Sequence, residues 1–187
     1  MSESNITKQA LSNSLKQLMN EIPFDKISVG QICERCGMSR KSFYYHFKDK
    51  YDLVNWIFDS EIIKVISNDL NINCYQDRWK LIEDTCDYFY ENRRFYRKAL
   101  QIKGQNSFCD HFREFLEPVL KYRLSEIIGN DKIDDFVLNF CNDAIIDAMV
   151  RWIGNVNCMD SKEFVHKLKY LTKVICATIS DEMEHME

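Results

Sequence analysis

Apolar residues recur at intervals of three and four along almost the whole chain, which is the spacing of one face of an α-helix. Only two prolines and five glycines interrupt the 187 residues, and we find no convincing run of the strict alternation typical of an amphipathic strand. A hydrophobic content of 45% is enough for a buried core. The sequence therefore predicts an all-α fold.

Two short helices joined by a glycine are predicted near the N-terminus. Ser28 and Gln31 have the spacing of a capping box, and they predict the start of a two-turn helix that Gly37 closes. Ser39 is a suitable N-cap for the next helix. Together these residues predict a helix-turn-helix over about residues 28–47, preceded by one longer helix.

The second helix of this pair carries two kinds of aromatic residue. At 100° per residue, Phe43 and Phe47 point one way, as expected for side chains that pack against the neighbouring helices. The opposite side carries a separate set: Lys41, Tyr44, Tyr45 and Lys48. Tyrosine rings and lysine ammonium groups can contact sugar, phosphate and base methyl groups, so this side predicts a DNA-contacting face. The alternative is an ordinary solvated face.

Charge divides the chain at the end of this region. Residues 1–50 carry eight Lys/Arg and five Asp/Glu, whereas residues 51–187 carry 17 and 24. A short basic reader joined to an acidic body would give this asymmetry, because attraction to phosphate acts locally. We therefore predict a DNA-binding domain over residues 1–50 and a second helical domain over residues 51–187.

The segment "FDKISVGQICERCGMSRKSFYYHFKDKYDLVNWIF" resembles the N-terminal region of TetR-type transcriptional regulators. The forms "KISV", "SRKSFYYHFKDKYDL" and "NWIF" look closest to regulators of the dihydroxyacetone-kinase operon type. The resemblance implies a three-helix reader, a long connecting helix, and an all-helical domain for ligand binding and dimerisation.

The same resemblance implies which residues meet DNA. Four residues would face the groove: Lys41, Ser42, Tyr44 and Tyr45. Three more would lie at backbone phosphates: Ser28, Lys48 and Lys50. Arg40 would contact either a base or a phosphate.

Two amphipathic helices are predicted near the C-terminus, and both have wide apolar stripes. Wide stripes indicate contacts inside the subunit and across a dimer interface, and the family resemblance implies the same. The residues expected at this interface are Phe136, Phe140, Ile145, Met149, Phe164, Leu168, Leu171 and Ile175. The alternative is a core stripe within a monomer.

Aromatic residues of the second domain provide candidates for a ligand pocket. These are Trp79, Phe89, Phe95, Tyr96, Phe108, Phe112 and Trp152. The same residues would serve equally well as a core. The pattern leaves the effector open, as an unknown small molecule or a protein co-regulator.

The motifs of common enzyme classes are missing, since the sequence has no GxSxG, P-loop, GxGxxG or HExxH. Cys33 and Cys36 form a CxxC, but no second CxxC or paired histidines complete a zinc set, and both fall on the apolar face of their helix. We expect no catalytic residue, metal or cofactor.

The expected compartment is the cytoplasm. No run approaches the ~20 apolar residues of a membrane span, and the first residues lack the pattern of a signal peptide. The eight cysteines are therefore expected to be reduced thiols.

These observations predict a DNA-binding transcriptional regulator and not an enzyme. The leading hypothesis is a ligand-responsive repressor that acts as a homodimer on a palindromic operator. The alternatives are an activator of a dihydroxyacetone-kinase-like operon, a thiol-based redox sensor, and a helical enzyme or carrier that has kept the fold.

Overall fold

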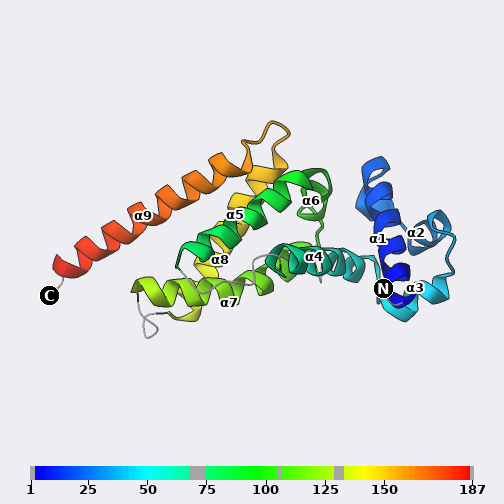
Figure 1. Ribbon diagram of the computed structural model, residues 1–187, viewed down its shortest axis with the longest axis horizontal. Helices are drawn as coiled ribbons and strands as arrows, with labels where there is room; N and C mark the ends of the chain where they lie inside the picture. Colours follow the sequence, from blue (N-terminus) through cyan, green and yellow to red (C-terminus); the bar gives the residue numbers. More distant parts are fainter. Residues whose placement is uncertain (1–2, 68–74, 105–106, 129–132, 186–187) are drawn as a thin grey trace. The chain divides into compact units, whose positions relative to one another are not determined.

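The computed structural model of the protein describes residues 3–67, 75–104, 107–128 and 133–185. Over these residues the secondary structure is helical, without a strand, and the prediction of an all-α fold is confirmed (Figure 1). The helices are α1 (Glu3–Glu21), α2 (Val29–Arg35), α3 (Arg40–His46), α4 (Lys50–Ser67), α5 (Tyr75–Glu91), α6 (Arg93–Ala99), α7 (Phe108–Ile128), α8 (Asp135–Gly154) and α9 (Ser161–His185), with a 3-10 turn η1 (Phe24–Lys26).

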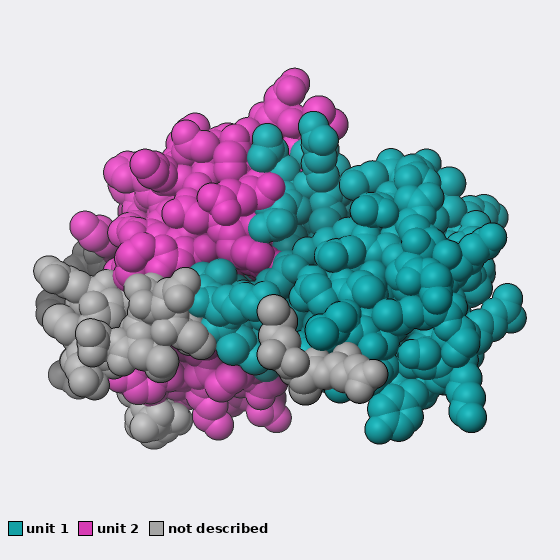
Figure 2. Space-filling view, turned by 45° about the vertical axis from the view of Figure 1, so that its right-hand side comes forward, with its two compact units in different colours: residues 1–68, 92–114 teal, residues 69–91, 115–187 magenta. Residues whose placement is uncertain are grey.

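The chain forms two compact units, which Figure 2 colours separately. Unit 1 contains residues 1–68 and 92–114, and unit 2 contains residues 69–91 and 115–187. Helix α4, which the sequence places in the second domain, therefore belongs to the same unit as α1–α3. The compact units do not end at residue 50. The boundary predicted there therefore stays a prediction about which part of the chain binds DNA.

Unit 1 has a core made by the apolar faces of α1 to α4. Helix α1 packs against α2, α4 and α6, and α2 also packs against α3. Leu15 of α1, Ile32 of α2, Phe43 of α3 and Ile57 of α4 are all fully buried. A buried side chain of this size contributes about 2 kcal/mol through the hydrophobic effect. This shared core fixes the orientation of α3.

The helix-turn-helix begins and ends at the residues that the sequence predicts. The Ser28 hydroxyl accepts a hydrogen bond from the Gln31 main-chain N–H at 3.2 Å, and the Gln31 side chain accepts one from the Ser28 N–H at 2.8 Å. Gly37 follows α2 with a φ of +67°, a conformation that glycine adopts without strain. Ser39 then caps α3, where its hydroxyl accepts a hydrogen bond from the Ser42 N–H at 3.1 Å. Local capping therefore defines both helices.

Unit 2 is held together by aromatic and polar contacts between α5, α8 and α9. The rings of Trp152 and Phe164 are stacked with centroids 4.0 Å apart, and the Trp152 indole N–H donates to the Met159 carbonyl at 2.8 Å. Lys169 of α9 forms an ion pair with Glu83 of α5. In the described part of the chain, no helix is both long and apolar enough to cross a bilayer.

Candidate nucleic-acid interface

Helix α3 separates its aromatic side chains as the sequence predicts. Phe43 and Phe47 are buried, with ring centroids 5.7 Å apart. Tyr44 is 58% exposed and Tyr45 is 83% exposed. Exposed rings of this size on a short helix are available for contact with another molecule, whereas the phenylalanine pair attaches the helix to its unit.

The cations of the first fifty residues fall into two groups. Arg35 makes two hydrogen bonds to the Glu21 carboxylate, at 2.5 and 2.6 Å, and Lys16 makes an ion pair with Glu61 at 2.5 Å. Lys26 lies 3.6 Å from the Asp25 carboxylate. Three further cations are exposed on α3 or directly after it and have no carboxylate of the described residues within salt-bridge distance: Arg40, Lys41 and Lys48. Exposed positive charge without an ion pair therefore surrounds the two tyrosines. Such charge is the main source of affinity for a phosphate backbone.

Lys50, which the resemblance places at a backbone phosphate, is half-buried and hydrogen-bonded within unit 1. Its ammonium group donates to the main-chain carbonyls of Phe24 at 2.7 Å, Ile27 at 2.8 Å and Asp25 at 3.3 Å. An ammonium group has three N–H donors, so none is left for a phosphate. Burial lowers the pKa of this lysine below its ordinary value. Lys50 therefore connects α4 to the loop before α2, a role that residue spacing does not reveal because the acceptors are main-chain atoms.

One of the two predicted serine contacts has a local structural role. The Ser28 hydroxyl is exposed, but it donates to the Gln31 side chain at 2.9 Å as part of the capping box. Ser42 is half-buried on the first turn of α3. DNA contact by either serine remains a prediction.

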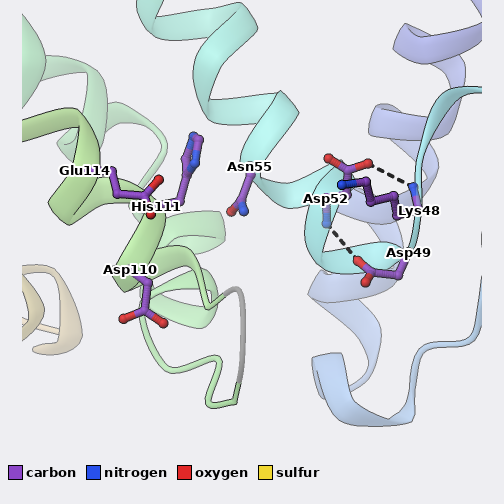
Figure 3. A pocket seen from close by; sticks show the side chains of 7 residues that line it. All are labelled: Lys48, Asp49, Asp52, Asn55, Asp110, His111 and Glu114. Atoms are coloured by element: carbon purple, nitrogen blue, oxygen red, sulfur yellow. Dashed lines mark hydrogen bonds between the residues drawn. The ribbon is translucent and has the colours of Figure 1, made fainter.

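A hollow of about 530 Å³ lies in unit 1 and is lined mostly by acidic side chains (Figure 3). Several of these carboxylates already have structural partners. Asp49 accepts hydrogen bonds from the N–H groups of Tyr51 and Asp52 at the start of α4, and Asp52 accepts one from the Lys48 N–H at 2.9 Å. No group of three or more side chains suited to a metal ion was found among the described residues.

His111, which also lines this hollow, connects α7 to α4. Its imidazole lies 2.7 Å from the Asp59 carboxylate, and its ring contacts the Phe58 ring edge-on with centroids 6.0 Å apart. The hydrogen bond to Asp59 raises the pKa of His111, although burial opposes this change. Residue spacing gives no sign of this pair, because its members are 52 residues apart.

The aromatic residues predicted to line a ligand pocket are distributed over both units. In unit 1, Phe95, Tyr96, Phe108 and Phe112 are buried, and the Phe108 ring lies 5.4 Å from Tyr96 and 6.0 Å from Phe112 between centroids. In unit 2, Phe89 and Trp152 are buried and Trp79 is half-buried. None of these residues lines the hollow in Figure 3. These contacts favour the core alternative.

The residues predicted at a dimer interface differ in exposure. Phe136 and Phe140 of α8 are 76% and 66% exposed, with stacked rings, and Leu171 of α9 is also exposed. Met149 and Phe164, which were predicted at the dimer interface, are instead buried within unit 2, so they favour the alternative of a core stripe. Ile145 and Leu168 are half-buried, and the Ile175 side chain lies outside the described residues.

The two buried thiols give little support to a redox sensor. Cys33 and Cys86 are buried, and burial raises the pKa of both, that of Cys86 to about 12. A raised pKa leaves less of the reactive thiolate. Cys74 and Cys176 lie outside the residues whose side chains are described.

The glycine-linked helices and their exposed basic and aromatic face define a helix-turn-helix DNA-binding regulator. Comparison with known protein families identifies the family to which this regulator belongs. Residues 14–57 match the bacterial regulatory proteins of the tetR family, and residues 77–174 match a transcriptional regulator C-terminal region. The chain belongs to the TetR family of transcriptional regulators, which confirms the resemblance seen in the sequence.

Individual relatives agree with this assignment. The chain is 26% identical over 155 residues, 81% of either chain, to the HTH-type dhaKLM operon transcriptional activator DhaS of Lactococcus lactis. It is 22% identical over 144 residues, 76% of this chain and 77% of the other, to the HTH-type transcriptional regulator SAR2658 of Staphylococcus aureus.

Solved structures show the same fold. A TetR transcriptional regulator from Streptococcus agalactiae superimposes with a TM-score of 0.69 at 22% identity, over 92% of this chain and 95% of that one. The dihydroxyacetone kinase operon activator DhaS gives a TM-score of 0.61 at 21% identity, over 92% of this chain and 97% of that one.

Proposed function

We propose that the protein is a ligand-responsive regulator that binds a palindromic operator as a homodimer, with α3 in the major groove. The observation that carries this proposal is the outer face of α3, where two exposed tyrosines lie among cations that have no ion pair. In helix-turn-helix proteins the second helix enters the major groove and the first crosses the backbone.

The proposed dimer uses α8 and α9. Phe136 and Phe140 expose large apolar rings on α8, and exposed apolar patches on a folded unit are typical of interaction surfaces. Two readers related by a twofold axis would recognise half-sites about one helical turn of DNA apart. Dimerisation would therefore supply the specificity that one short helix lacks.

An effector would act by favouring one separation of the two readers. A ligand that binds one conformation better shifts the population and changes the affinity for the operator. The Asp59–His111 contact connects α4, which follows the reader, to the first turn of α7. This contact offers a physical route by which changes near α7 reach α4.

We propose repression as the direction of control, because occupying a promoter requires no further surface. Activation of a dihydroxyacetone-kinase-like operon is the second candidate. The observation in its favour is the Lactococcus lactis relative, which is named as an activator and covers 81% of this chain.

Operator selection from random DNA, followed by gel shifts, tests DNA binding. We expect Tyr45→Ala to weaken binding to the selected operator by about tenfold or more, since a thymine methyl group or a backbone sugar packed against the exposed ring loses that contact. Tyr122→Ala, which removes an exposed tyrosine from α7, is the matched control and should bind like the wild type.

Equal affinity of the Tyr45→Ala variant and the wild type would contradict the assignment of α3 as the reader. A reporter gene driven by the native promoter then gives the direction of control. Loss of the protein should raise expression if it represses, and a fall in expression would establish the activator instead.

A further inference from the structure

Gly30 and Arg40 lie in contact across the helix-turn-helix. Gly30 is the second residue of α2, and Arg40 is the first residue of α3. A β-carbon at position 30 would lie 2.6 Å from Nη2 of Arg40 and 3.3 Å from both its Cζ and its Nε. The guanidinium group therefore occupies space that every other amino acid at position 30 would fill.

The glycine at position 30 is not required by backbone conformation. Gly37 and Gly104 have positive φ angles, of +67° and +115°, whereas Gly30 lies within a helix and has no such angle. Glycine is a poor helix former, so a position inside a short helix is unfavourable for it. The approach of Arg40 gives a physical reason for a glycine at this position.

The charge of Arg40 remains available although its side chain rests on α2. The residue is exposed, and no carboxylate in the described part of the chain lies within salt-bridge distance of it. Arg35 on the same helix pair shows the opposite arrangement, because the Glu21 carboxylate already binds its guanidinium group. A guanidinium group that is held in place but not neutralised is suited to an external anion.

The direction of the Arg40 side chain distinguishes between the two parts of DNA that it could meet. At 100° per residue, Arg40 lies at the margin of the exposed face of α3, between Phe47 and Tyr44. Its guanidinium group extends from there onto α2. The first helix of this motif crosses the phosphate backbone, whereas residues at the N-terminus of the second helix reach base edges. Arg40 starts the second helix, but its guanidinium group lies against the first helix and is therefore directed toward the backbone.

We infer that Gly30 is a positioning residue that allows the Arg40 guanidinium group to rest on α2 and there to contact a phosphate of the DNA backbone. This inference rests on the proposed DNA-binding function. It concerns the one contact that the sequence left open between a base and a phosphate. A guanidinium group can donate two parallel hydrogen bonds to a phosphate, so its direction matters as well as its charge.

Alanine at position 30 separates positioning from folding. Its β-carbon would meet the far end of a flexible side chain, so Arg40 can move away while α2 stays intact. Alanine is also the better helix former. We expect Gly30→Ala to keep or raise the melting temperature while it weakens operator binding.

The experiment measures operator affinity of the full-length protein by fluorescence anisotropy at several salt concentrations. Arg40→Ala should weaken binding about tenfold to the selected operator and to each of its single-base variants, and should reduce the salt slope by about one. Gly30→Ala should weaken binding in the same way. In the Arg40→Ala background, Gly30→Ala should have no further effect on operator affinity, because the guanidinium group that it would displace is absent.

Gly154→Ala is the matched control. Gly154 lies at the end of α8 with no atom within 4 Å of the position of an added β-carbon. The same substitution there should leave operator affinity unchanged.

Three results would overturn the inference. Unchanged binding by Gly30→Ala would show that Arg40 works equally well from another position. A loss in Arg40→Ala confined to one base pair would identify a base contact. If Arg40→Ala leaves operator affinity unchanged while Tyr45→Ala lowers it strongly, the protein binds DNA but Arg40 is not part of the interface. If Tyr45→Ala also leaves operator affinity unchanged, the result contradicts the proposed role of α3 in DNA binding, and not only the role of Arg40.

Discussion

The Lys50 ammonium group donates a hydrogen bond to the Phe24 carbonyl at 2.7 Å and lies 4.5 Å from the centroid of the Phe24 ring. The first residue of α4 is thereby attached to the turn that precedes α2. A lysine in a basic stretch is usually taken as a DNA contact, and here its neighbour Lys48 is exposed while Lys50 is engaged inside the unit. We therefore expect opposite effects from replacing the two lysines: a change at Lys50 should lower stability, and a change at Lys48 should lower affinity for DNA.

Lys50→Met should destabilise the protein by about 1–2 kcal/mol, because three main-chain carbonyls lose a charged donor in a partly buried site. Urea unfolding measures this loss. Lys48→Met should leave the free energy of unfolding unchanged within about 0.5 kcal/mol. In gel shifts only the Lys48 variant should lose affinity at a temperature where both are folded. The reverse pattern would return Lys50 to the DNA interface.

The His111–Asp59 pair predicts a dependence of stability on pH. Hydrogen bonding to Asp59 raises the pKa of His111 above its ordinary value of 6.5, and the charges of Glu114 and Asp52 act in the same direction, against burial. The protonated form is therefore favoured in the folded state. Its contribution is fully present below about pH 6.5 and is lost as the pH rises through the higher folded pKa.

Melting temperatures between pH 5.5 and 8.5 test this dependence. His111→Gln should flatten the profile in the interval above pH 6.5. His166→Gln, which changes an exposed histidine on α9, should keep the wild-type profile. A steep profile that survives in the His111 variant would assign the dependence to another group.

Gly37→Ala should destabilise the protein by about 1–2 kcal/mol, since a β-carbon at a φ of +67° is strained even where space is open. Gly37→Asn should cost less, because asparagine tolerates this conformation better. Thermal unfolding compares the two variants. Equal stability of Gly37→Ala and the wild type would mean that the turn can rearrange without its positive φ.

Phe140→Glu should convert the proposed dimer into a monomer, because it places a charge within an apolar contact. The ring is 66% exposed in the single chain, so the unit itself should remain folded. Light scattering at micromolar concentration measures the change, and operator affinity should fall with it. Val156→Glu, at an exposed position after α8, is the control. A dimer that persists in the Phe140 variant would place the interface elsewhere.

Local patterns allowed accurate prediction where neighbouring residues decide the structure. Ser28, Gln31 and Ser39 form the predicted caps, and Phe43 and Phe47 are buried as their spacing requires. These features depend on residues within a turn or two of one another.

Contacts between distant segments could not be predicted from the sequence patterns. Periodicity predicts that Met149 and Phe164 lie on an apolar face, but it does not say whether that face meets its own unit or another molecule, and both are buried. The partner of Arg35 lies 14 residues away and that of His111 lies 52 residues away. One-dimensional spacing carries no information about such pairs.

Unit 1 is built from two separate segments of the chain, which affects how it folds during synthesis and where the chain can be divided. The ribosome completes α1 to α4 well before residues 92–114, which belong to the same unit. Until then Phe58 lacks its ring contacts with Phe108 and Phe112, and the Met19 carbonyl lacks the Lys98 ammonium group. A truncated chain that stops after α4 would expose these surfaces. The reader helices are thus poorly suited to be cut out and transplanted into a chimaeric regulator unless α6 and the first turns of α7 go with them.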